Sequence, residues 1–285
     1  MRPTTLFLSL FATTTWLSAC RDDVTADPAT KVRPRDQKSG CYTDTKGSAM
    51  VRIPMPGGQD FCIDQRAATQ AEFAEFVEAV RPTQKMPTPP EGHVMAKLCA
   101  EWIDPVTPAS KYDEFPSCGK YYDPVSFADK PMRCMDWCAA YAFCAWSGKR
   151  LCGNHGAPIA EDLTTDGSEL GFVCSNGGKD AYQFDPSARP DCAADSHSLD
   201  QRFPPADCVG HGTPFDQVSS VTGWLPIYTD ECLMYAAEVP PTGPVYSPAC
   251  RKFGGIGPTG VRACTHASAM PRRYPADYGV RCCSD

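Results

Sequence analysis

Sulfur chemistry stands out in this chain, because its 285 residues include 17 cysteines. Thiolates bind soft metal ions, whereas paired thiols form disulfides in an oxidising compartment. The segment Met132–Gly153 contains four of these cysteines. We favour a packed helix held by disulfides, since the spacing fits no standard structural zinc pattern. The alternative is a metal site whose ligands would be Cys134, Cys138, Cys152 and His155.

One short helix must position these cysteines. Asp136 is suited to cap its N-terminus, and Gly148 can end it in a left-handed conformation. Four residues recur at the spacing of one helical face, namely Trp137, Ala140, Tyr141 and Cys144. We therefore predict that Cys144 points to the core and that Cys138 lies on a different face.

The first residues of the chain predict export. Arg2 precedes the short apolar run Leu6–Leu17, and Leu17-Ser18-Ala19-Cys20 resembles a bacterial lipobox. This resemblance implies cleavage before Cys20 and its acylation, which would anchor the mature chain through lipid in a membrane of the bacterial cell envelope. Arg21 is not the aspartate that retains lipoproteins in the inner membrane of enteric bacteria. We therefore expect the outer membrane, with the domain facing the periplasm or the surface. A plain secretory signal peptide is the alternative.

Cysteine count and charge limit the function classes. Cleavage would leave 285 − 19 = 266 residues, enough for one well-packed domain. Acylation of Cys20 would leave 17 − 1 = 16 cysteines, which allows up to eight disulfides. A formal net charge of −7 without a basic stripe argues against a nucleic-acid partner.

The chain divides into three expected parts: a signal peptide (1–19), a lipidated cysteine with a flexible tether (20–40), and one domain (41–285). The tether segment is polar and charged, and it lacks apolar periodicity. The domain begins near Cys41 with two predicted strands, Met50–Pro54 and Phe61–Asp64, around a Pro-Gly-Gly turn. Cys41 and Cys62 flank this hairpin and are placed to pair across it.

The remaining signals predict one further helix and much irregular chain. Thr69–Glu72 is a capping box, and Pro82 ends the helix that follows. Its apolar stripe consists of Phe73, Phe76, Val77 and Val80. Arg81–Lys130 is rich in proline and carries Cys99 and Cys118, which predicts long surface loops held by a disulfide. The C-terminal part predicts turns and short strands. The fold class is therefore a single, loop-rich α+β domain in which disulfides compensate for irregular backbone.

Several of these segments resemble one known family, the formylglycine-generating-enzyme or sulfatase-modifying-factor domain. The segments that carry the resemblance, in the family order, are Phe61–Asp64, Ala68–Val77, Pro131–Leu151, Cys250–Gly255 and Tyr278–Cys282. Within the hallmark segment the matching residues are Pro131, Trp137, Ala140, Phe143, Cys144, Trp146 and Gly148–Leu151. The chain is identified as a cysteine-rich bacterial-lipoprotein form of this family.

The resemblance implies an irregular, C-type-lectin-like single domain supported by calcium. It also implies two disulfides by position, Cys144–Cys282 and Cys174–Cys264. The family's calcium-binding asparagine is matched by Ser220. An acidic loop supplies further calcium candidates: Asp185, Asp191 and Asp195. A solvated surface loop is the alternative for these aspartates, so calcium is the one cofactor that the sequence leaves open.

Active members of the family oxidise a substrate cysteine to formylglycine with copper(I), which is held by two thiolates. Copper(I) is a soft ion and prefers such ligands. In this chain the two thiolate positions fall on Thr259 and Gly254, and the interval Gly255–Cys264 has no other cysteine before its last residue. We therefore expect no copper site and assign no catalytic residue.

Two functions follow as hypotheses. The first is a surface-anchored, non-catalytic binding module for a protein, peptide or glycan ligand. The second is a formylglycine-generating oxidase that acts on exported sulfatases with thiolates from elsewhere. The pairs available for it are Cys282 with Cys283 or Cys134 with Cys138. The five histidines are scattered and are interpreted as surface or loop residues: His93, His155, His197, His211 and His266.

Overall fold

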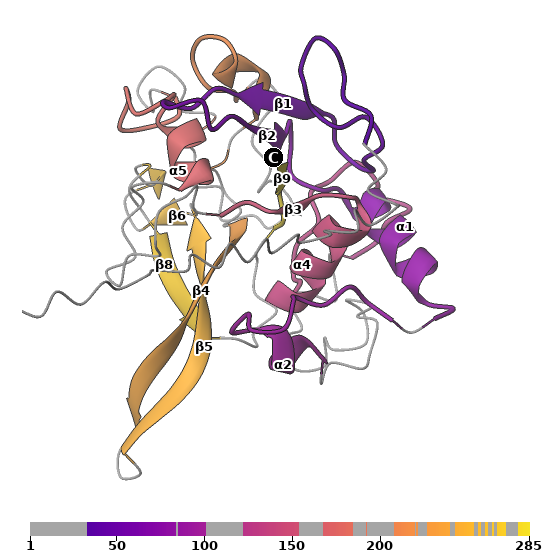
Figure 1. The fold of residues 1–285 in the computed structure, drawn as a ribbon, viewed down its shortest axis with the longest axis vertical. Coiled ribbons are helices and arrows are strands. Elements are labelled where there is room, and N and C mark those ends of the chain that lie inside the picture. The colour runs from indigo at the N-terminus through magenta and orange to yellow at the C-terminus, as the bar shows by residue number, and fades with distance from the viewer. Residues whose placement is uncertain are drawn as a thin grey trace, which may run out of the picture. The chain divides into compact units, whose positions relative to one another are not determined.

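The computed structural model is drawn as a ribbon in Figure 1. It describes residues 33–83, 85–100, 122–153, 168–184, 192, 208–219, 221, 227–239, 243–253, 256–257, 260–261, 264, 267–271 and 279–285. None of the helices in these ranges has the length and apolar character that crossing a membrane requires. Several residues singled out from the sequence lie outside the described ranges: Cys20, Cys118, His155, Asp185, Asp191, Asp195, His197, Ser220, Gly254, Thr259 and His266.

A four-stranded antiparallel sheet brings distant parts of the chain together. Its order is β1 (Met50–Ile53), β2 (Phe61–Asp64), β9 (Cys282–Ser284) and β3 (Arg150–Leu151). The first two strands form the predicted hairpin. Gly57 and Gly58 in its turn have positive φ angles of 86° and 78°, which residues with a Cβ rarely adopt. Because β9 lies between β2 and β3, the sheet is complete only when the last described residues join it.

Helix α1 (Gln70–Val80) begins at the predicted capping box. The Thr69 side chain accepts a hydrogen bond from the Glu72 N–H at 3.3 Å, and the Glu72 carboxylate accepts one from the Thr69 N–H at 2.8 Å. The predicted apolar stripe is buried. The rings of Phe73 and Phe76 lie 5.9 and 6.0 Å from that of Phe143 in α4 (Trp137–Trp146). Both the helix and its buried face are confirmed.

Helix α4 starts and stops at the predicted residues. Asp136 Oδ1 accepts a hydrogen bond from the Ala139 N–H at 2.8 Å. Gly148 follows the helix with a positive φ of 77°, and the Lys149 N–H donates to the Cys144 carbonyl at 2.8 Å. This is the hydrogen bonding of a glycine-terminated helix. Cys144 is fully buried, so its predicted core position is confirmed.

The segment between α1 and α4 differs from the prediction. The sequence predicts surface loops around Cys99, but α2 (Ala96–Ala100) is helical there, and Leu98 and Cys99 are buried. Cys99 is bonded to Cys138 of α4. A helix of five residues has little stability of its own. Burial and the disulfide hold it in place, and no local sequence pattern signals either of them.

The C-terminal part holds longer strands than the sequence predicts. A second antiparallel sheet has the order β4 (Ile227–Val239), β5 (Gly243–Phe253) and β8 (Ala267–Pro271). A two-stranded ribbon consists of β6 (Ile256–Gly257) and β7 (Gly260–Val261), and a 3-10 turn, η3, spans Phe215–Gln217. The molecule is therefore a mixture of helices and open antiparallel sheets, as the α+β fold class predicts.

Residues 33–40 contact the domain, although they fall in the segment for which the sequence predicts a tether. Arg33 Nη2 lies 2.8 Å from Asp44 Oδ1, and Arg33 Nη1 donates to the Gly148 carbonyl at 2.8 Å. Arg35 donates to the Tyr42 hydroxyl and to the Asp285 carbonyl, both at 3.0 Å. The described unit thus runs from Arg33 to Asp285.

β9 takes part in two buried apolar clusters of the core. One cluster joins the inner faces of α1 and α4 and includes Cys144 and Cys282. The other joins β1, β2 and α5 (Glu169–Cys174) and includes Cys152 and Cys283. Consecutive residues of a strand point to opposite faces, so the adjacent cysteines of β9 reach different clusters.

Candidate functional site

The cysteines are the first candidates for chemistry, and the structure joins them in pairs. The three pairs expected from the sequence are joined: Cys41–Cys62, Cys144–Cys282 and Cys174–Cys264. Four more pairs are Cys99–Cys138, Cys152–Cys283, Cys192–Cys208 and Cys232–Cys250. Cys134 is also disulfide-bonded. The metal hypothesis is therefore wrong for the sulfurs of Cys134, Cys138 and Cys152, since none of them is a free thiolate.

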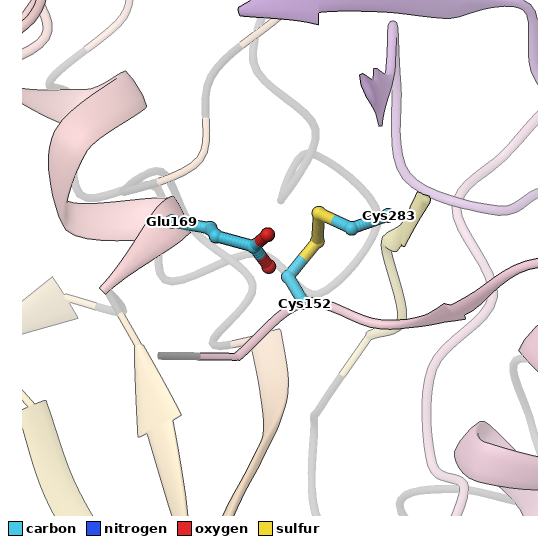
Figure 2. A group of neighbouring side chains, drawn as sticks. All are labelled: Cys152, Glu169 and Cys283. Carbon is cyan, nitrogen blue, oxygen red and sulfur yellow. A yellow bond between two sulfur atoms is a disulfide. The ribbon is translucent and has the colours of Figure 1, made fainter. Parts of the chain in front are cut away.

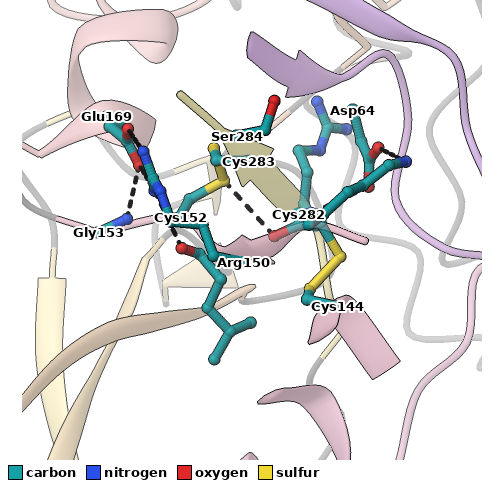
Figure 3. Close-up of a disulfide and its surroundings, with 12 residues drawn as sticks. Asp64, Cys144, Arg150, Cys152, Gly153, Glu169, Cys282, Cys283 and Ser284 are labelled. Carbon is teal, nitrogen blue, oxygen red and sulfur yellow. Dashed lines mark hydrogen bonds and ion pairs between the residues drawn. A yellow bond between two sulfur atoms is a disulfide. The ribbon is translucent and has the colours of Figure 1, made fainter. Parts of the chain in front are cut away.

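The vicinal cysteines of β9 point in opposite directions (Figure 3). Cys282 is bonded to Cys144 of α4, and Cys283 is bonded to Cys152, which follows β3. A copper(I) ion with two ligands in linear geometry needs two thiolates that point toward the ion. The side chains of adjacent strand residues point to opposite faces of the sheet. Cys282 and Cys283 therefore cannot supply such a pair while β9 is a strand.

Figure 2 shows the group of described residues that best resembles a metal site: Cys152, Glu169 and Cys283. Their ligand atoms lie within 4.8 Å of one another and are buried. The two sulfurs are bonded to each other, and the Glu169 carboxylate accepts hydrogen bonds from Arg150 at 2.8 and 2.6 Å and from the Gly153 N–H at 2.7 Å. With sulfurs and carboxylate so occupied, the group stabilises the fold and does not bind a metal in this oxidation state.

A buried ion pair lies on the other side of β9. Lys149 Nζ is 2.5 Å from Asp64 Oδ1 and 2.8 Å from the Ser48 carbonyl, and the Cys282 N–H donates to Asp64 Oδ2 at 2.9 Å. Both charged side chains are almost completely buried. Desolvation outweighs these contacts and raises the pKa of Asp64 to about 6. Because both side chains are buried, we assign the pair to holding β2 and β9 to the end of α4.

A partly exposed aromatic stack is the described feature best placed to meet a ligand. The Trp137 ring stacks between His93 and Tyr141, with both centroid distances 5.4 Å and interplanar angles of 18° and 22°. His93 Nε2 lies 3.3 Å from Asp230 Oδ1, at the base of β4. Desolvation and then the charge of Asp230 raise the pKa of Tyr141. Trp137 itself is 2% exposed. The rings of His93 and Tyr141 and the Asp230 carboxylate, all half-buried, are therefore the parts of this group that a ligand can reach.

His93 has a hydrogen-bond partner at one ring nitrogen and a carboxylate near the other. Nδ1 accepts a hydrogen bond from the Met95 N–H at 3.1 Å, while Nε2 faces Asp230. A general base needs a free nitrogen lone pair within reach of a substrate proton. His93 has none in this tautomer, so the stack is suited to recognition and not to proton transfer. The sequence interpretation of His93 as a surface residue missed the stack, because no spacing rule relates His93 to Trp137.

The chain around Ser220 is organised by buried polar groups. The Arg281 guanidinium donates to the Ser219 carbonyl at 3.1 Å and to the Ser219 hydroxyl at 2.9 Å. On the other side, the Val221 N–H donates to Gln183 Oε1 at 2.6 Å. Arg281 is 1% exposed, and burial lowers its pKa to about 10. The two described neighbours of Ser220 in the sequence are thus held by buried polar groups, and the group that holds Ser219 is positively charged.

Comparisons with known proteins agree with this architecture. A family model described as "Sulfatase-modifying factor enzyme 1-like domain" matches residues 40–214, which is more than half of the 285 residues. A comparison with curated proteins gave no match. The matched range contains the β1–β2 hairpin, both capped helices and α5. The chain belongs to the sulfatase-modifying factor enzyme 1-like domain family.

Proposed function

We propose that this protein is a lipid-anchored binding module, built on a sulfatase-modifying-factor scaffold, that has lost formylglycine-generating chemistry. The state of the cysteines carries this proposal. The two positions matched to the family's copper thiolates are Thr259 and Gly254 in the sequence. The substitute thiols that the oxidase hypothesis needs, Cys282 with Cys283 or Cys134 with Cys138, all lie in disulfides. A disulfide sulfur is not the thiolate that binds a metal.

We further propose that the scaffold is the irregular C-type-lectin-like fold. Three features support it: separate small antiparallel sheets, two well-capped helices, and long connections between them. In such a scaffold, ligands meet loops that a rigid core positions. The stack of His93, Trp137 and Tyr141 beside Asp230 is the described group that we assign to ligand contact. A peptide, protein or glycan suits its ring faces and carboxylate.

Calcium is not part of the proposed function. The buried guanidinium of Arg281 is hydrogen-bonded to Ser219. A divalent cation bound at Ser219 would face this positive charge in a medium of low dielectric constant, which is unfavourable.

A thiol count on the folded, mature chain tests the proposal. Alkylation under denaturing conditions without reductant, followed by mass spectrometry, should modify no cysteine. The reduced chain serves as the control for complete alkylation. Two alkylatable thiols that become protected when copper(I) is added would establish a dithiol copper site and contradict the proposal.

The anchor has its own test. Replacing Cys20 by serine removes the acyl acceptor, so the Cys20→Ser chain should move from the membrane fraction to the soluble fraction. Arg21→Lys, a neighbouring change that keeps the acceptor, should remain with the membrane. Because residues 33–40 contact the domain, only residues 21–32 would act as the linker, with a root-mean-square span of about 20 Å. Membrane association that persists in Cys20→Ser would rule out the lipid anchor.

A further inference from the structure

Strand β4 forms an edge of the second sheet. At its base the Asp230 N–H donates to the Cys152 carbonyl at 2.8 Å, so the open part of this edge begins after Asp230. The order of that sheet is β4-β5-β8, and β8 pairs only with residues 249–253 of β5. Among the described residues, the rest of β5, from Gly243 to Pro248, pairs only with β4. Figure 1 shows these two strands as a twisted ribbon that continues past the end of β8. An exposed strand edge presents unpaired backbone groups to other strands.

The register of the ribbon identifies which backbone groups face outward. Cys232 lies directly opposite Cys250, with their Cα atoms 4.0 Å apart. Such a close approach is typical of the non-hydrogen-bonded pairs of an antiparallel ladder, whose N–H and C=O groups point away from the partner strand. Alternate residues share this direction, so the outward positions of β4 are Cys232, Met234, Ala236 and Glu238. No strand in the described part of the chain pairs with β4 on its outer side.

The opposite edge of the ribbon is closed by proline. Pro248 and Pro244 lie opposite Met234 and Glu238, so both occupy outward positions of β5. Proline has no N–H, and at an outward position it removes a donor without weakening the β4–β5 ladder. β8 covers the remainder of this edge. The β4 edge has no proline over its 13 residues, so the ribbon is blocked on one side and open on the other.

We propose that the β4 edge pairs antiparallel with β4 of a second copy of this chain, around a twofold axis at Tyr235. This register places Cys232 opposite the partner's Glu238 and Met234 opposite the partner's Ala236, so every outward group finds a hydrogen-bonding partner. Met234, whose side chain is 51% exposed, gains an apolar neighbour across the axis. The result is one continuous six-stranded sheet made of two three-stranded sheets.

Charge selects this register over its neighbour. With the axis at Tyr235, Glu231 lies opposite the partner's Val239, and no two glutamates face each other. Moving the axis half a residue, to lie between Met234 and Tyr235, would oppose Glu231 to the partner's Glu238, which is unfavourable for directly opposite like charges. In that register, residues whose backbone N–H and C=O groups point outward would also lie opposite residues whose backbone groups point inward, so the two strands could not form hydrogen bonds. A twofold pairing uses the β4 edge of both copies, so this contact closes at a dimer and does not extend to a filament.

Sedimentation velocity on the full chain over a range of concentrations tests the proposal. The wild-type chain should approach the mass of two chains. Ala236→Pro removes an outward N–H from each β4 and should weaken self-association by about tenfold or more. Tyr246→Pro is the matched control, because it makes the same change at an outward position of β5 and should leave the dimer intact. The Cys20→Ser background separates pairing from association through lipid.

A cross-linking variant tests the register without relying on proline. At the axis, Tyr235 lies opposite its own copy in a non-hydrogen-bonded pair, with an expected Cα separation of about 4.5 Å, which suits a disulfide. Tyr235→Cys should therefore form a covalent dimer on a non-reducing gel, whereas Leu233→Cys should not. A wild-type chain that stays monomeric at every concentration would overturn the proposal, as would equal effects of the two proline variants. Binding of an extended peptide of another protein at the β4 edge, in place of a second copy of this chain, would also overturn the proposal.

Discussion

At the scale of single residues, the ion pair of Lys149 and Asp64 carries the strongest electrostatic consequence. Both side chains are almost fully buried, and Lys149 Nζ lies 2.5 Å from Asp64 Oδ1. Burial still raises the pKa of Asp64 from 3.8 to about 6, because desolvation is the largest influence on the carboxyl group. The folded state therefore binds the carboxyl proton more tightly than the unfolded state does.

This pKa shift predicts a pH dependence of stability. The contribution of Asp64 to the free energy of unfolding is fully present below about pH 4 and is lost as the pH rises through about 6. Relative to Asp64→Asn, the wild-type chain should lose up to about 3 kcal/mol over this window. Denaturant unfolding of both chains at several pH values from 4 to 7 measures the difference. If the wild type gained stability relative to the variant as the pH rises, the pKa of Asp64 would be lowered and not raised.

Residue roles followed from the sequence only where the signal was local or where a family motif supplied it. The burial of Cys144 follows from its helical face, and its bond to Cys282 follows from the family resemblance. The stack of His93 on Trp137 and the contact of His93 with Asp230 had no such signal. Those residues come from three separate segments, and only tertiary packing brings them together.

At the scale of elements, the two capped helices were predictable because their stop and start signals lie within a few residues. Thr69 and Glu72 form the predicted capping box of α1. Asp136 caps the start of α4, and Gly148 ends that helix with a positive φ angle. Helix α2 and the long strands β4 and β5 were not predictable in this way. The stability of α2 comes from a disulfide and burial. That of β4 comes from pairing with β5, the next strand in the chain, and no period-2 apolar pattern in either strand signals this pairing.

The capping box of α1 gives a prediction at this scale. In Thr69→Ala the Glu72 N–H loses its acceptor, which should lower the free energy of unfolding by about 1 kcal/mol. Thr69→Ser keeps the hydroxyl and is the matched control. Denaturant unfolding of the three chains measures the effect. Equal losses in the alanine and serine variants would attribute the effect to the methyl group of Thr69 and not to the cap.

At the scale of the whole molecule, two disulfides that share β9 should act together. Cys144–Cys282 and Cys152–Cys283 close loops with sequence separations of 138 and 131 residues. When either bond is present, the other closes only a short additional loop. In a chain-entropy description, the second bond therefore adds less stability than the first.

Removing the two bonds should consequently be non-additive. We expect the chain that lacks both pairs, with all four cysteines replaced by alanine, to lose about 1–2 kcal/mol more than the sum of the two single-bond losses. Thermal and denaturant unfolding of the three variants and the wild type give the four free energies of unfolding that a double-mutant cycle compares. Losses that simply add would mean that the two bonds stabilise independent parts of the domain.

The central position of β9 also governs the order in which the protein can be made. Synthesis delivers Cys144 and Cys152 well before their partners, which follow 138 and 131 residues later. During that interval both thiols emerge beside Cys134 and Cys138, with which premature bonds can form. Oxidative refolding of the reduced chain should therefore be faster and more complete when a disulfide isomerase is added, and without one it should accumulate shuffled, protease-sensitive chains.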